Sequence, residues 1–96
     1  MNSEEEFYKK LKISLEETTQ FPSEYMYKFI IPADKKKFTE IETIFDHTGA
    51  VIKTKPSKTG KYNSITVLVK MKNADAVIEK YKEVSNVEGV ISLWFI

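Results

Sequence analysis

Four lysines within nine residues make the stretch KTKPSKTGKYNS, residues 53–64, the strongest candidate for chemistry in this chain. The stretch has no acidic residue, so it could hold a nucleotide phosphate, contact a polyanion, or form a solvated turn. A Walker phosphate loop has the pattern G-x-x-x-x-G-K-[ST] and opens a helix whose N-terminus faces the anion. Here Lys55 replaces the first glycine, and Tyr62 follows Lys61 where a hydroxyl residue must bind magnesium. We therefore expect no nucleotide phosphate at this loop.

A β-hairpin turn accounts for the proline and the glycine of the same stretch. Pro56 cannot donate to a strand ladder, and Gly60 is typical of a turn. The four lysines then act as point charges, whose attraction to an acidic or polyanionic partner falls with salt. These lysines are Lys53, Lys55, Lys58 and Lys61. A purely solvated hairpin is the alternative interpretation.

The other titratable residues do not form a constellation typical of an enzyme. His47 is the only histidine, and its neighbour Asp46 cannot face it on a helix. One histidine without any cysteine is also a poor transition-metal site. The carboxylates follow the polar sides of two predicted helices: Glu40, Glu42, Asp46, Asp75, Glu79 and Glu83. We therefore expect no catalytic residue, no metal, no cofactor and no enzymatic activity.

Composition and charge narrow the class of protein further. Ninety-six residues correspond to one domain, and a hydrophobic content of 42% is typical of a soluble globular chain. The net charge of +1 predicts no general attraction to nucleic acid or membrane. No apolar run reaches the roughly 20 residues of a membrane span, and the start MNSEEEFYKK does not resemble a secretory signal. We expect a cytoplasmic protein without membrane contact.

The apolar pattern of residues 21–96 predicts the order β-α-β-β-α-β. Strands are expected at 25–32, 50–55, 62–71 and 90–96, and helices at 33–49 and 74–84. Asn73 is a typical N-cap, and Gly49 suits a left-handed C-cap. This order is that of a ferredoxin-like α+β fold, with a four-stranded antiparallel sheet and two helices on one face.

Residues 1–20 precede this domain. Phe7, Leu11 and Leu15 recur every four residues, which predicts a short amphipathic helix. A frayed arm outside the domain is the alternative.

A two-layer fold of this kind leaves the second face of the sheet uncovered. The residues predicted on that face are Met26, Lys28, Ile30, Thr66, Leu68, Lys70 and, in one of the two registers of the last strand, Trp94 and Ile96. A large apolar open face typically binds a partner, a ligand or a second copy of the chain. We expect Leu68 and Trp94 to contribute apolar interface area, and we predict a homodimer. Scattered surface residues, or coverage by the N-terminal arm, are the alternatives.

RNA is a candidate partner because the RNA-recognition motif shares this topology. That domain stacks bases on aromatic residues of its central strands. The outward positions of the predicted third strand carry only one aromatic residue, Tyr62. The chain also lacks arginine, the usual residue for bidentate phosphate and guanine contacts. RNA or single-stranded nucleic acid is therefore the second choice of partner.

Two motifs resemble the YbeD-like family of small bacterial proteins of unknown function. They are Phe21-Pro22 followed by Tyr25 and Lys28, and Lys55-Pro56-Ser57-x-x-Gly60-x-Tyr62-x-Ser64-x-Thr66. The resemblance covers residues 21–96 and implies a ferredoxin-like fold similar to regulatory ACT domains, no established catalytic residues, and a bacterial, cytoplasmic setting. Family members often carry arginine where this chain has Lys55, which argues against a bidentate role there.

These observations favour a non-enzymatic regulatory or adaptor domain that binds a protein partner or a small ligand. Tyr62, Ser64 and Thr66 alternate along one strand face, so their polar groups would line up beside the lysine loop. A strand with ordinary polar outward residues is the alternative. The candidate binding residues are Lys53, Lys55, Ser57, Lys58, Lys61, Tyr62, Ser64 and Thr66.

Overall fold

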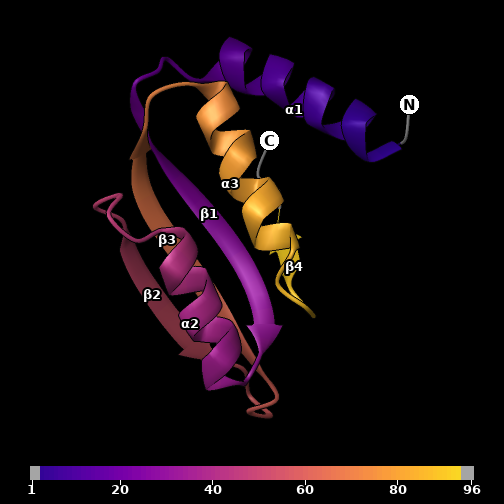
Figure 1. Ribbon diagram of the computed structural model, residues 1–96, viewed down its shortest axis with the longest axis vertical. Helices are drawn as coiled ribbons and strands as arrows, with labels where there is room; N and C mark the ends of the chain where they lie inside the picture. Colours follow the sequence, from indigo (N-terminus) through magenta and orange to yellow (C-terminus); the bar gives the residue numbers. More distant parts are fainter. Residues whose placement is uncertain (1–2, 94–96) are drawn as a thin grey trace.

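A four-stranded antiparallel sheet forms one layer of the protein (Figure 1). The structure is a computed structural model that describes residues 3–93. The strand order is β2-β3-β1-β4. The strands are β1 (Ser23–Pro32), β2 (Val51–Pro56), β3 (Tyr62–Met71) and β4 (Ile91–Leu93). The helices α2 (Lys35–Ile44) and α3 (Ala74–Ser85) cover one face, so the predicted ferredoxin-like α+β fold is confirmed.

Period-two alternation in the two central strands builds the core. Tyr27 lies opposite Val67 and Phe29 lies opposite Ile65, and all four side chains are fully buried towards the helices. The rings of Tyr27 and Tyr81 are 4.7 Å apart in an edge-to-face arrangement, which joins β1 to α3. The residues between these positions must therefore point to the opposite face of the sheet.

Helix α3 begins at the cap that the sequence predicts, whereas α2 begins at Lys35, two residues after its predicted start. The side chain of Asn73 accepts a hydrogen bond from the Ala76 amide at 2.8 Å, and Asp34 accepts one from the Lys36 amide at 2.9 Å. The apolar stripe of α3 is buried in full, with Ala74, Val77, Ile78, Tyr81 and Val84 facing the core.

Helix α2 ends at Ile44, well before the end predicted at Gly49. Local hydrogen bonds replace helical ones here: Asp46 accepts from the His47 amide at 3.1 Å, and the Thr48 hydroxyl donates to the Phe45 carbonyl. His47 itself adopts a positive φ of 62°. The expectation that Asp46 and His47 cannot meet was therefore wrong, because they lie in a turn and their side chains are 3.4 Å apart.

The N-terminal segment is a helix, α1 (Ser3–Thr18), and not a frayed arm. Its Leu11 and Leu15 are buried, and the helix packs against α3 on the helical side of the sheet (Figure 1). The helical layer therefore contains three helices where two were predicted. Coverage of the open sheet face by the N-terminal segment is also excluded, because α1 lies on the other side.

The end of the chain is described only in part. Strand β4 pairs with β1, with Ile91 opposite Ile30, as predicted for the last strand. The predicted face positions of Trp94 and Ile96 lie outside the described residues. No helix within residues 3–93 is long and apolar enough to cross a membrane.

Candidate functional site

The sheet face opposite the helices is organised in rows that run across the strands. Residues directly opposite each other in antiparallel strands share a face. The pairing register therefore places Val51, Leu68 and Met26 side by side on β2, β3 and β1. Val51 is 53% exposed and Met26 is 41% exposed, which makes this an apolar row open to solvent.

Two further rows alternate lysines with hydroxyl and apolar groups. Lys53, Thr66 and Lys28 form the row next to the apolar one. Lys55, Ser64 and Ile30 form the row after it, and Ile91 of β4, 52% exposed, extends that row. Thr66 of the central strand thus lies between two lysines, and Ser64 lies between a lysine and an apolar side chain.

The β2–β3 turn closes this face at one end and is built as the sequence predicts. The Ser57 amide donates to the Tyr62 carbonyl at 2.8 Å, and the Ser57 hydroxyl accepts from the Tyr62 amide at 3.2 Å. Gly60 has a φ of 74°, which favours glycine. The Ala33 amide donates to the Lys61 carbonyl at 2.9 Å, so the turn is tied to the segment before α2.

The structure divides the predicted binding residues into two groups. Those on the open face are Lys53, Lys55, Tyr62, Ser64, Thr66 and Leu68. Those at the turn are Ser57, Lys58 and Lys61, and Ser57 serves the turn itself through its hydrogen bonds. Trp94, the other predicted interface residue, is outside the described residues.

Sequence reasoning missed two apolar residues of the open face, Val51 and Ile91. The signal was present for Val51, because Val51, Lys53 and Lys55 alternate with Ile52 and Thr54 in the segment VIKTKP. Ile91 had no such signal, since only the pairing register of β4 decides which way it points.

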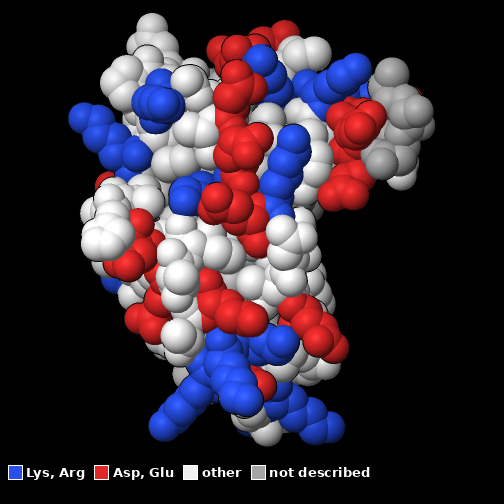
Figure 2. All heavy atoms as spheres, viewed as in Figure 1, with Lys and Arg blue, Asp and Glu red and all other residues white. Residues whose placement is uncertain are grey.

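Charge is distributed unevenly between the two layers: acidic residues are nearly absent from the open face, whereas the helical layer carries both signs of charge. The open face and its turn carry six lysines and one acidic residue, Glu24: the lysines are Lys28, Lys53, Lys55, Lys58, Lys61 and Lys70. The other thirteen acidic residues lie in the helices or in the segments that border them. Figure 2 shows the helical side, where acidic side chains run through the middle and lysines gather at the end near the turn and the start of α2.

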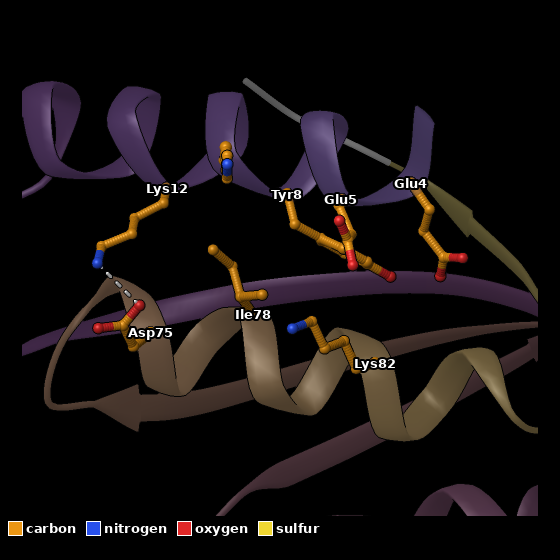
Figure 3. A pocket seen from close by; sticks show the side chains of 8 residues that line it. Glu4, Glu5, Tyr8, Lys12, Asp75, Ile78 and Lys82 are labelled. Atoms are coloured by element: carbon orange, nitrogen blue, oxygen red, sulfur yellow. Dashed lines mark ion pairs between the residues drawn. The ribbon is translucent and has the colours of Figure 1, made fainter. Parts of the chain in front are cut away.

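A groove of about 510 Å³ lies between α1 and α3 (Figure 3). Its lining residues are Glu4, Glu5, Tyr8, Lys9, Lys12, Asp75, Ile78 and Lys82. Lys12 and Asp75 form an ion pair of 3.1 Å at one end, and the Lys82 ammonium lies 5.4 Å from the centre of the Tyr8 ring. Burial and the Glu4 carboxylate raise the pKa of Tyr8. Three acidic and three basic side chains balance here, so the groove does not select a ligand by charge.

Among the described residues, the largest pKa shifts belong to two core tyrosines, Tyr27 and Tyr81, and the half-buried Tyr25 lies beside them. The hydroxyls of Tyr25 and Tyr81 are 2.8 Å apart, and the Tyr27 hydroxyl donates to the Val77 carbonyl at 3.0 Å. Burial raises the pKa of all three tyrosines. Tyr27 and Tyr81 are almost inaccessible to solvent, so their hydrogen bonds are structural.

Metal-ligating side chains do not gather in the part of the chain that the structure describes. No group of three histidine, cysteine, aspartate or glutamate residues within 3–93 is placed to hold a metal ion. His47 is exposed and contacts only Asp46 among the ion pairs of the described residues.

The strand order and the helices on one face define a small ferredoxin-like domain. Comparison of the sequence with protein-family patterns assigns the chain to a family. The pattern of the family "Protein of unknown function (DUF493)" matches residues 16–93. The chain therefore belongs to this family, which is the YbeD-like family that its motifs resemble. The match begins within α1, so most of that helix lies outside the family domain.

A solved structure shares the fold. The solution structure of protein HP0495 from H. pylori is similar over 79% of this chain and 86% of that chain, with a TM-score of 0.63 and 23% sequence identity. A comparison with curated proteins finds no match. These findings establish the family and the fold.

Proposed function

We propose that this protein is a non-enzymatic regulatory or adaptor domain whose open sheet face binds a protein partner or a small ligand. The observation that carries the proposal is the uncovered face itself. It contains the apolar row of Val51, Leu68 and Met26, whose two outer members are exposed. The adjacent row adds Lys53 on β2 and Lys28 on β1. An exposed apolar surface bordered by polar groups is typical of an interaction site.

Two further features support a binding role over an enzymatic one. Thr66 and Ser64 supply hydroxyl groups between the flanking side chains, which suits hydrogen bonding to a partner. The groups with perturbed pKa values lie either in the core or in the charge-balanced groove, away from this face. The family resemblance favours a bacterial, cytoplasmic setting for this role.

Charge-reversal variants test the proposal. The face variant combines Lys28→Glu with Lys53→Glu, and the control combines Lys10→Glu with Lys36→Glu on α1 and α2, which changes the net charge equally. Tagged wild type and both variants are used to capture partners from native cells at low salt, and eluates are read by mass spectrometry. We expect wild type and control to recover the same defined species and the face variant to lose it. Equal recovery by all three proteins would refute a role for the open face.

Single-stranded nucleic acid is the second candidate, favoured by one observation. Tyr62 is 47% exposed on the open face, next to the turn that carries Lys58 and Lys61. An exposed aromatic ring beside lysines is one element of a base-stacking surface. Filter binding of single-stranded RNA and DNA at low salt tests it, with Tyr62→Ala as the variant. Retention that falls with this variant and with salt would support this candidate, and no retention would remove it.

A further inference from the structure

We propose that the open sheet face binds an amphipathic helix whose apolar stripe is flanked by acidic residues, and that the helix axis runs across the strands. This inference rests on the proposed function and names the kind of partner. The spacing of the rows and the charges in them support the inference. The pairing register of β2, β3 and β1 decides which residues lie in each row.

The spacing of the apolar row matches that of a helix surface. Neighbouring strands are about 4.8 Å apart, and one turn of an α-helix rises about 5.4 Å. Val51, Leu68 and Met26 lie on three successive strands, so each can contact one turn of a helix that crosses them. A stripe at i, i+4 and i+7 presents one apolar residue per turn, which fits this row.

The charged residues beside the apolar row indicate which charge the bound helix should carry next to its apolar stripe. Rows two residues apart along a strand are separated by roughly 6.6 Å, which is within the reach of long side chains on a helix about 10 Å wide. Lys28 and Lys53 lie in the row on one side, and Lys70 lies in the row on the other, opposite Glu24. Glutamate or aspartate on one flank of the stripe would therefore meet two lysines, Lys28 and Lys53. On the other flank an acidic side chain would meet Lys70, which lies opposite Glu24.

Other occupants fit this surface less well. A second copy placed face to face would bring the lysines of one open face against those of the other, and like charges in contact are unfavourable. Nucleic acid would leave the apolar row without a partner, and among the described residues of this face only Tyr62 could stack on a base. An added strand at the edge of β2 would meet Pro56, which cannot donate to a ladder.

Solution NMR with defined probes tests the inference on the full chain. The probe is a 14-residue peptide with leucine at i, i+4 and i+7 and glutamate on both flanks. One control peptide has the same composition without a stripe, and the other carries lysine in place of glutamate. A single-stranded oligothymidylate is the fourth probe. We expect only the striped acidic peptide to shift the amides of Met26, Thr66 and Leu68, with weak, salt-sensitive affinity.

Matched variants decide where the peptide binds. We expect Met26→Glu, and separately the pair Lys28→Glu and Lys53→Glu, to weaken the affinity by about tenfold or more. Ile13→Glu changes an apolar residue on α1 that is more exposed than Met26 and should leave the affinity within about twofold. The dispersed amide spectrum of each variant reports whether it is folded.

Each other outcome overturns the inference. Equal binding of the unstriped peptide would show charge attraction alone, and binding of oligothymidylate in place of the peptide would show a nucleic-acid surface. If no peptide shifts these amides at millimolar concentration, no acidic helix binds there. Capture from cells that still depends on Lys28 and Lys53 would then uphold the proposed function while this inference fails.

Discussion

Three tyrosines, the buried Tyr27 and Tyr81 and the half-buried Tyr25, hold β1 to α3 through hydroxyl groups as well as rings. Such groups lie deep in a small core only because each hydroxyl has a partner, since an unpaired buried hydroxyl is costly. No buried side-chain nitrogen or oxygen of the described residues is left without a hydrogen bond. At this scale the protein stabilises its scaffold with polar aromatic residues and keeps its lysines on the surface.

The tyrosines predict a loss of stability at alkaline pH. Burial raises the pKa of Tyr27 and Tyr81 above the ordinary value of 10.0. Below pH 10 the folded and unfolded chains both keep these protons, so the two tyrosines do not lower the free energy of unfolding there. Above pH 10 the unfolded chain loses them first, and each tyrosine lowers the free energy of unfolding by about 1.4 kcal/mol per pH unit.

Urea unfolding of wild type and Tyr81→Phe between pH 8 and pH 11 measures this effect. The variant lacks one of the buried phenols, so its stability should decline less steeply above pH 10. Titration of the lysines is common to both proteins and cancels in the comparison. Equal slopes for the two proteins would contradict the assignment.

At the scale of elements, Gly60 and Gly89 both have a positive φ, and replacing them by alanine should cost different amounts of stability. A methyl group added to Gly60 in the β2–β3 turn would meet open space, whereas a methyl group added to Gly89 would lie 2.9 Å from Cγ of Pro32. We expect Gly60→Ala to cost about 1–2 kcal/mol from the left-handed backbone alone. Gly89→Ala should cost more, because the end of β1 must also move. Chemical denaturation of both variants checks the order, and a larger loss for Gly60→Ala would contradict it.

Helix α1 is predicted to be an addition to a domain that folds without it. The family match starts at residue 16, and α1 contributes to the core mainly through Leu11 and Leu15. We expect a fragment of residues 19–96 to keep the sheet amide pattern of the full chain at lower thermal stability. In the full chain, Leu15→Ala should cost about 2 kcal/mol and exposed Ile13→Ala less than about 0.5 kcal/mol. An unfolded fragment would contradict this division of the chain.

Most elements of the fold can be predicted from the sequence because their signals are local. The alternation in Tyr62–Met71 gives the bounds of β3, and Asn73 marks the start of α3. The end of α2 could not be predicted, because Asp46 and Thr48 form side-chain bonds that compete with the helix. The docking of α1 on α3 depends on tertiary packing, which periodicity does not report.

The candidate site could be predicted in part for the same reason. Alternation assigns Met26, Lys28, Thr66 and Leu68 to the open face, and the structure agrees. The rows across three strands could not be predicted, since they depend on the register of β2 and β4 against their neighbours. The registers of β2 and β1 against β3 place Lys53 and Lys28 on the two sides of Thr66.

The whole molecule distributes its charges unevenly, since the open face and its turn carry six lysines and one acidic residue. The helical layer carries thirteen acidic residues and the other nine lysines. Dimerisation stays a prediction, and this charge pattern gives it a salt dependence. Two open faces repel each other at low ionic strength, and salt screens the repulsion while the apolar rows still attract. Sedimentation at low salt and at high salt should show a dimer fraction that rises with salt. A dimer that weakens with salt would place the contact elsewhere.

Photo-cross-linking in native cells tests the central claim, that partners bind the open sheet face. A photoreactive phenylalanine analogue replaces Leu68 on that face or, as the control, Ile13 on α1. We expect the Leu68 position to cross-link to one defined species and the Ile13 position to form no such cross-link. Cross-links from Ile13 alone, equal cross-links from both positions, or none from either would contradict it.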